Sequence, residues 1–138
     1  MVNNNKIRQK INILQKNIKF LDSLRQIPFD EFLADPRNYL SATRILQISV
    51  EAMIDIAHHI IARENLGIPQ SYHDAIKILS REDYLPKDKE ATFRAMIRFR
   101  NRAVHMYDEL NEEEIYRIIC ENLGDFQEYM DSIIKRCF

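Results

Sequence analysis

The sequence predicts an all-α fold, an up-and-down bundle of about five helices in a single domain spanning residues 1–138. Apolar residues recur at steps of three and four over long stretches, as in amphipathic helices. Helix start and stop residues separate these stretches. Only two glycines occur, which argues against β-hairpins and against a glycine-rich phosphate loop.

The first predicted helix has one apolar stripe and should end near Pro28. The stripe consists of Ile7, Ile11, Leu14, Ile18 and Leu21. A short turn or half-helix is expected around residues 30–33. This segment would connect the first helix to a much longer second one.

The second predicted helix runs from Pro36 to Leu66, about 30 residues or roughly 45 Å. Asp35 is a suitable N-cap, and Gly67 and Pro69 are stop signals. The helix carries two apolar stripes, which indicate burial on two sides. We expect one side to meet its own domain and the other a second subunit.

Three further helices complete the predicted bundle. One begins at Ser71, with Asp74 completing a capping box and Tyr72 on the apolar face. The next begins near residues 86–88. The last begins at Asn111, with Glu114 in a second capping box, and its apolar stripe continues to residue 133.

Charge and composition exclude several function classes. The net charge of −1 gives no overall positive field for nucleic acid, so any RNA contact must use a local patch. No apolar run is long enough for a membrane span, and the N-terminus lacks a signal-peptide pattern. Cys120 and Cys137 lack C-x-x-C spacing and are interpreted as structural, in a reduced, cytoplasmic setting.

The stretch RFRNRAVHMYDE, residues 98–109, concentrates the ionisable side chains. Arg94, Arg98, Arg102 and His105 follow at steps of four, four and three on one helix face, with no acidic residue between 91 and 107. Arg100 and His105 are five apart, about 140° around a helix. One ligand can meet both if the helix ends near His105 or if a second subunit packs alongside. Both arrangements favour a site at a helix end, shared across a dimer.

These residue types suit cleavage of an RNA phosphodiester. A histidine exchanges protons near neutral pH and can deprotonate a 2′-hydroxyl or protonate a leaving 5′-oxygen. An arginine fork can bind the phosphate and stabilise its added charge. The products would be a 2′,3′-cyclic phosphate and a 5′-hydroxyl. Asn101, four residues before His105, can hydrogen-bond along the same face.

RNRAVHMY, residues 100–107, resembles the R-x4-H-x-Y signature of HEPN domains, most closely that of HepT-like toxins. Residues 32–61 look like that family's long helix, and residues 67–86 look like its G-x-P-x-S-Y connection and following helix. The similar segments cover most of residues 30–110. The resemblance thus extends well beyond one motif.

The resemblance implies a homodimeric, metal-independent endoribonuclease of a type II or type VII-like toxin–antitoxin system, with no cofactor. Arg100 and His105 match the family's catalytic pair and Asn101 its polar follower. The implied partner is an MNT-type nucleotidyltransferase antitoxin, which in some pairs attaches AMP to the tyrosine that matches Tyr107. Arg98 and Arg102 lie outside the signature, and we assign them to RNA phosphate binding.

Other interpretations remain open at this point. The chain could be a non-catalytic HEPN module that binds nucleotides or presents substrate to a nucleotidyltransferase, or a dimerising structural bundle. Glu51 and Asp55 are either solvated or hold Arg100, and Tyr107 is either modified or packed. His58 and His59 are interpreted as packing or interface residues, because paired histidines without a third ligand make a poor metal site. The sequence leaves the RNA substrate and the antitoxin stoichiometry undetermined.

Overall fold

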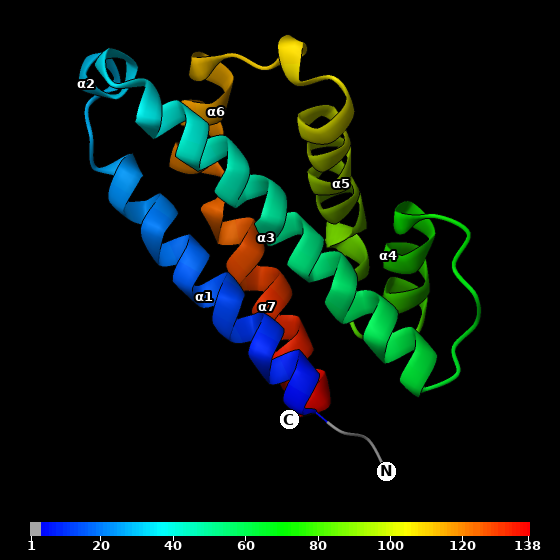
Figure 1. Cartoon of the computed structure of the whole chain (residues 1–138). Coiled ribbons are helices and arrows are strands. Elements are labelled where there is room, and N and C mark those ends of the chain that lie inside the picture. The colour runs from blue at the N-terminus through cyan, green and yellow to red at the C-terminus, as the bar shows by residue number, and fades with distance from the viewer. Residues whose placement is uncertain (1–3) are drawn as a thin grey trace.

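The computed structural model describes residues 4–138, and within them helices joined by loops make up the fold, with no strand (Figure 1). The all-α bundle expected from the sequence is confirmed. The described residues form seven α-helices and two short 3-10 turns, against the about five helices predicted. The additional helices arise from one short connecting helix and from one break.

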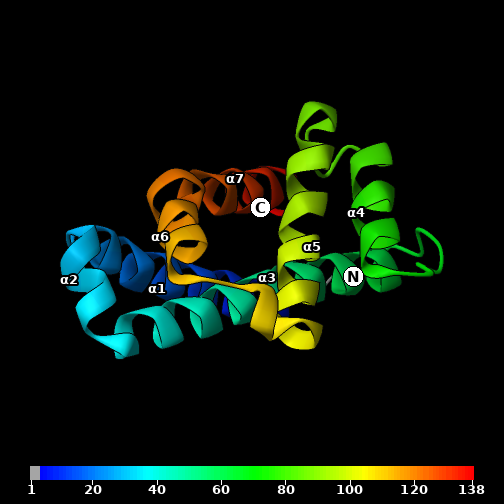
Figure 2. The same cartoon turned by 90° about the horizontal axis from the view of Figure 1, so that it is seen from above.

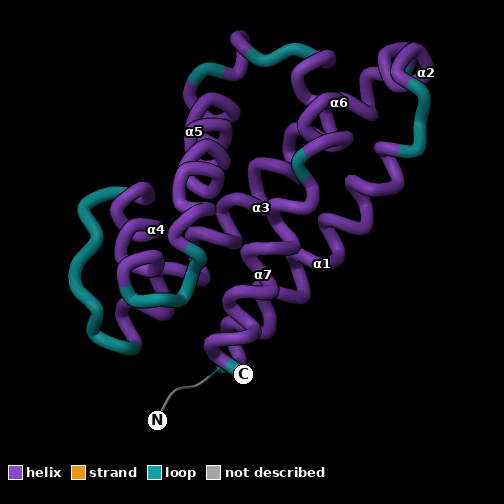
Figure 3. Tube along the Cα trace, turned by 180° about the vertical axis from the view of Figure 1, so that it is seen from behind, coloured by secondary structure: helices purple, strands orange, loops and turns teal. Residues whose placement is uncertain are grey.

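Three helices form the long part of the bundle. α1 (Asn5–Arg25) and α3 (Pro36–Arg63) run antiparallel along each other, joined by the short α2 (Phe29–Ala34). α7 (Leu123–Cys137) packs against α1 on the far side of this pair, as the view from behind makes clear (Figure 3). α3 is therefore the central helix that the sequence predicted.

Two shorter helices lie across α3. α4 (Tyr72–Arg81) and α5 (Glu90–His105) run side by side and cross α3 steeply (Figure 2). After α5 the chain passes through a 3-10 turn, Tyr107–Glu109, into α6 (Glu112–Glu121). The C-terminal end of α5 thus lies beside α3 at the edge of the bundle, where a side chain can reach both α3 and solvent.

The last predicted helix is in fact two helices, which corrects the expectation of one from residue 111 to 133. The break lies at Asn122, whose backbone has φ −119° and ψ 3° and whose side chain binds Asp125. The apolar stripe continues through the break from Ile119 to Leu123. Periodicity alone therefore could not reveal it.

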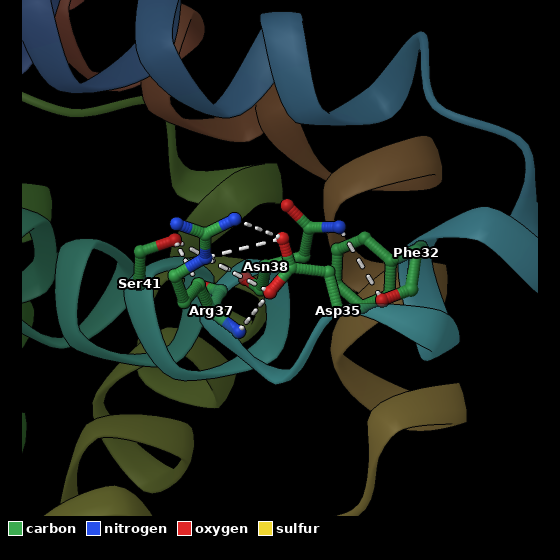
Figure 4. A network of polar contacts seen from close by, with 5 residues as sticks. All are labelled: Phe32, Asp35, Arg37, Asn38 and Ser41. Atoms are coloured by element: carbon green, nitrogen blue, oxygen red, sulfur yellow. Dashed lines mark hydrogen bonds and ion pairs between the residues drawn. The ribbon is translucent and has the colours of Figure 1, made fainter.

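Side-chain caps set the helix starts where the sequence placed them. Asp35 accepts the backbone N–H of Arg37 at 3.0 Å and also binds the Arg37 guanidinium, as Figure 4 shows. Ser71 caps α4 through the N–H of Asp74 at 3.0 Å, and Asn111 caps α6. Neither predicted capping box closes: the Asp74 carboxylate accepts the N–H of residue 70, and the carboxylate of residue 114 binds an arginine on α5.

α3 is buried on two sides by its own chain. Ala52 and Ile56, which belong to the second of the two apolar stripes, are 4 % and 1 % exposed within the single chain. The Tyr129 hydroxyl donates to the Met53 carbonyl at 2.7 Å, and burial raises the pKa of Tyr129 far above its usual range. By length and composition α3 could cross a membrane, but 56 % of its most apolar window is buried by neighbouring helices, as in the core helix of a bundle.

Candidate functional site

Arg100 points from α5 towards α3 and is anchored by one edge of its guanidinium. Its Nε donates to Glu51 Oε2 at 3.0 Å, and its Nη1 donates to Asn101 Oδ1 at 3.2 Å. The side chain is only 16 % exposed. Among the described residues 4–138 its Nη2 has no hydrogen-bond partner. The terminal nitrogens therefore keep N–H groups free for an anion, such as a phosphate.

Glu51 is itself held in place. Gln47, one turn earlier on α3, donates from Nε2 to Glu51 Oε2 at 3.1 Å. The same carboxylate oxygen thus accepts from both Gln47 and Arg100. Of the two acids whose role the sequence left open, Glu51 binds Arg100, whereas Asp55 pairs with Lys10 at 3.0 Å.

The aromatic ring of Tyr72, which the sequence did not place at this site, also lies against Arg100. The guanidinium carbon of Arg100 lies 5.2 Å from the centroid of the Tyr72 ring, within range of a cation–π contact. Tyr72 had been expected on the apolar face of its helix, but it is 37 % exposed. The cap at Ser71 makes Tyr72 the first residue of α4, which places it beside α3 and α5. Apolar periodicity carries no such signal.

His105 is the last residue of α5, which is the first of the two arrangements that the spacing of Arg100 and His105 allowed. Its side chain is exposed and makes no hydrogen bond or ion pair within the part of the chain that the structure describes. The amide of Met106 closes the last turn on the Arg102 carbonyl at 2.8 Å. The imidazole is therefore accessible at the same end of α5 as Arg100.

Tyr107 follows in the 3-10 turn and is 42 % exposed. Its ring centroid lies 6.4 Å from that of Tyr39 on α3. Burial, together with the neighbouring Tyr107, raises the pKa of Tyr39 to about 12. Tyr39 therefore stays protonated at neutral pH beside a tyrosine whose ring is open to solvent.

The other arginines of the cluster lie on a different side of α5. Arg98 and Arg102 are each two residues from Arg100 and hence about 160° around the helix from it. Both line a groove of about 620 Å³ between α5 and helices α3, α6 and α7. Arg102 donates from its two terminal nitrogens to the Glu114 carboxylate at 2.5 and 3.0 Å. Arg100, with Glu51 and Asn101, thus lies on one side of α5, and Arg98 and Arg102 lie on another.

The acids that neutralise the cluster come from outside residues 91–107. Arg94 pairs with Glu90 at 3.5 Å, and Arg102 pairs with Glu114. Arg98 has no acidic partner within residues 4–138. The unbroken positive face seen in the sequence is therefore reduced to Arg98 and the exposed His105.

The two histidines of α3, expected as packing or interface residues, differ in their exposure. His58 is exposed, and its ring meets the edge of Tyr72 at 5.8 Å between centroids. His59 is partly buried, and its Nε2 has no partner. Across the described residues no group of three or more His, Cys, Asp or Glu side chains is arranged to hold a metal ion. Cys120 and Cys137 are both free thiols.

Comparison with known proteins gives a consistent result. A family model described as Ribonuclease HepT-like matches residues 14–133. An mRNA nuclease HepT from Shewanella oneidensis is 38 % identical over 88 residues, which is 64 % of this chain and 66 % of that protein, slightly under two thirds of its length. A tRNA nuclease HepT from Aphanizomenon flos-aquae is 24 % identical over 127 residues, 92 % of this chain and 86 % of that protein.

Solved structures with the same fold include a tri-AMPylated HEPN toxin of Shewanella oneidensis in complex with its MNT antitoxin. That toxin is 32 % identical, and the match covers 96 % of this chain and 99 % of the other with a TM-score of 0.87. The likeness therefore extends over the whole bundle, including the end of α5 where Arg100 and His105 lie.

Proposed function

The chain belongs to the ribonuclease HepT-like family, and from that premise we propose that it is the endoribonuclease toxin of a type II or type VII-like toxin–antitoxin pair. One observation carries the proposal. Arg100 is anchored through Nε to Glu51 while its terminal nitrogens keep N–H groups free, and an unpaired His105 ends the same helix. Free N–H groups on a guanidinium that is only 16 % exposed are suited to bind an anion such as a phosphate.

The proposed reaction is attack of a ribose 2′-oxygen on the neighbouring phosphorus, with departure of the 5′-oxygen. His105 takes the 2′-hydroxyl proton as base or returns a proton to the leaving oxygen as acid. Arg100 binds the phosphate and stabilises its added negative charge, and Asn101 orients the guanidinium through its 3.2 Å contact. No metal ion or cofactor takes part in these steps.

We propose that the working form is a homodimer. In-line attack places the 2′-oxygen and the departing 5′-oxygen on opposite sides of the phosphorus, so two imidazoles can serve as base and acid at the same time. Two copies facing each other at the ends of α5 would bring two imidazoles and two arginines to one phosphate. His105 is exposed in the single chain, which leaves it free to meet a second copy.

The proposed partner is an MNT-type nucleotidyltransferase antitoxin, and both proteins would act in the cytoplasm. The exposed phenol of Tyr107 is the proposed site of AMP attachment. An adenylyl group there would add bulk and negative charge two residues from His105 and so repel RNA phosphates. The structural relative is AMPylated and bound to an MNT antitoxin, which supports this form of control.

Arg98 and Arg102 are proposed to act outside the reacting centre. Arg98 keeps its charge uncompensated and can attract a flanking RNA phosphate. Arg102 is bound by Glu114, so its contribution to RNA binding would require that pair to open. Arg98 would therefore serve binding of the strand rather than the chemical step, whereas Arg102, while paired with Glu114, would serve the fold.

The main alternative is a non-catalytic module that binds nucleotides or presents substrate to a nucleotidyltransferase. Such a module needs Arg100 for a phosphate but has no use for a free imidazole beside it. The exposed, unpaired state of His105 is the feature that favours the enzyme.

The decisive experiment is cleavage of total cellular RNA by the purified protein in EDTA, with His105→Ala beside it. The enzyme should yield 2′,3′-cyclic phosphate and 5′-hydroxyl ends, and the variant should lose cleavage while binding RNA comparably. Mass analysis of Tyr107 ensures that the preparation is unmodified. Equal cleavage by the variant, or none by unmodified protein, would leave the binding module as the better account.

A further inference from the structure

Tyr72 presents a half-exposed aromatic ring next to the proposed phosphate-binding arginine. The Arg100 guanidinium carbon lies 5.2 Å from the ring centroid, and the ring is 37 % exposed. The Tyr72 hydroxyl has no hydrogen-bond partner among residues 4–138. A tyrosine that served only the core would bury its ring and satisfy its hydroxyl.

A second ring extends this surface along α3. His58 meets Tyr72 edge-on at 5.8 Å and is itself exposed. His58 is seven residues after Glu51, so both lie on one face of α3 about 10 Å apart along its axis. The pair of rings therefore lies directly beyond Arg100 on the same surface.

Beyond His58 the surface becomes a basic groove. A depression of about 550 Å³ between α1 and α3 is lined by His58, Lys6 and Lys10 among others. Its one acid, Asp55, is paired with Lys10 at 3.0 Å, and Glu51 is paired with Arg100. An anionic strand leaving Arg100 would therefore pass two aromatic rings and the charge of Lys6, while Lys10 and Asp55 offset each other until a phosphate competes for Lys10.

We propose that Tyr72 and His58 form a nucleobase-stacking subsite for a nucleotide next to the cleaved phosphate, with the following phosphates directed to Lys6 and Lys10. This inference rests on the proposed ribonuclease function. Stacking on an aromatic side chain is the general way proteins hold an unpaired base, and it tolerates any base because each has a π-face. The subsite would bind single-stranded RNA with little base preference.

The chain contains no tryptophan, so Tyr72→Trp introduces a single fluorescent reporter that keeps an aromatic ring at the position. The probe is a short single-stranded RNA carrying 2′-O-methyl groups, which cannot be cleaved by attack of the 2′-oxygen. A stacked base should quench the reporter in a saturable way.

Phe138→Trp is the matched control. The Phe138 ring also carries an arginine, with the Arg8 guanidinium carbon at 4.4 Å, but it lines a different depression between α1 and α7. Quenching at position 72 and none at position 138 is the expected result. Equal responses at both positions, or no response at position 72 while RNA is bound, would overturn the subsite.

A second test uses RNA lacking one base. In the parent protein, an abasic nucleotide at the stacked position should weaken binding about tenfold, the usual scale for one base–aromatic stack. In Tyr72→Leu the intact RNA should bind about tenfold more weakly than it binds the parent. Removing the base from the RNA should then weaken its binding to this variant little further. Tyr72→Phe should behave as the parent. An abasic penalty that is unchanged in Tyr72→Leu at every position would reject stacking on this ring.

The parent protein separates failure of the subsite from failure of the proposed function. If it cleaves ordinary RNA but Tyr72→Leu shows the parental abasic penalty, only the subsite is wrong. If the parent neither binds nor cleaves RNA, both proposals are wrong. Urea unfolding of Tyr72→Leu verifies that any loss of binding comes from folded protein.

Discussion

Arg100 and Arg102 lie two residues apart on α5 and each binds one glutamate, yet the two pairs leave different atoms free. Arg100 uses Nε for Glu51, so its terminal nitrogens keep free N–H groups. Arg102 uses both terminal nitrogens for Glu114, and its Nη2 also approaches the Glu109 carbonyl at 3.5 Å. The difference lies in the free N–H groups and not in exposure, because the Arg100 side chain is 16 % exposed and that of Arg102 is 33 % exposed.

The difference follows from what each glutamate is attached to. Glu51 lies on α3, where Gln47 donates a hydrogen bond to the same carboxylate oxygen that accepts from Arg100. Glu51 therefore meets the guanidinium at its Nε and leaves the terminal nitrogens to other partners. Glu114 lies in the first turn of α6, directly after the loop that follows α5. The Arg102–Glu114 pair therefore fastens the two helices across that loop. We infer that the way an arginine is paired, more than its charge, separates a ligand-binding role from a structural one.

The largest effect should come from Arg100→Lys. Lysine keeps the charge but cannot bind Glu51 and a phosphate through one planar fork, so RNA cleavage should fall on the order of 10²-fold. Initial rates on a defined RNA measure the loss. Arg98→Lys is the matched control and should stay within a few-fold of the parent. A similar loss in both variants would mean that charge alone matters on α5.

Glu51→Gln should have the next largest effect. The amide can still accept from Arg100 but no longer attracts it as an anion, so the guanidinium is less well oriented and kcat/KM should fall about tenfold. Asp55→Asn, one turn later on α3 and paired only with Lys10, is the control. If the two variants had equal activity, the Glu51 contact would be incidental to the reaction.

The sequence predicted this site unevenly, for physical reasons. The five-residue spacing of Arg100 and His105 pointed to a helix that ends near His105 as one way for both to meet a ligand, and α5 does end at His105. The sequence could not decide whether Glu51 binds Arg100, because two residues 49 positions apart share no local sequence pattern. The same applies to Tyr72, whose helical spacing indicated burial although its position at the start of α4 exposes it.

The positive face predicted for α5 also depended on contacts between residues far apart in sequence. Residues 91–107 contain no acid, but Glu114 on the next helix pairs with Arg102. The capping pattern had assigned Glu114 to the start of α6, where only its backbone N–H serves the cap. A local motif can name the residue types of a site, whereas their pairing depends on tertiary contacts.

Arg102→Met tests the structural half of the comparison. The change leaves the largely buried Glu114 carboxylate without its partner, so the free energy of unfolding should fall by about 1–2 kcal/mol while RNA cleavage stays within about twofold. Urea unfolding measures the first and initial rates the second. Adding Glu114→Gln should recover part of the loss. Lost cleavage at unchanged stability would instead return Arg102 to the RNA-binding role expected from the sequence.

The smallest effect concerns His73 on α4 and Arg98, which has no acidic partner within residues 4–138. Burial lowers the pKa of His73, and the positive charges of Arg94 and Arg98 lower it further. The unfolded chain then binds a proton at a higher pH than the folded one, so this contribution to stability is fully present above the ordinary histidine pKa of about 6.5 and is lost as pH falls through the depressed folded value. Urea midpoints measured from pH 7.5 to pH 5 should therefore fall with pH less steeply in His73→Gln, and Arg98→Gln should lie between that variant and the parent. A parental slope in Arg98→Gln beside a shallower one in His73→Gln would show that solvent screens Arg98 from His73, and a parental slope in both variants would show that His73 makes no such contribution.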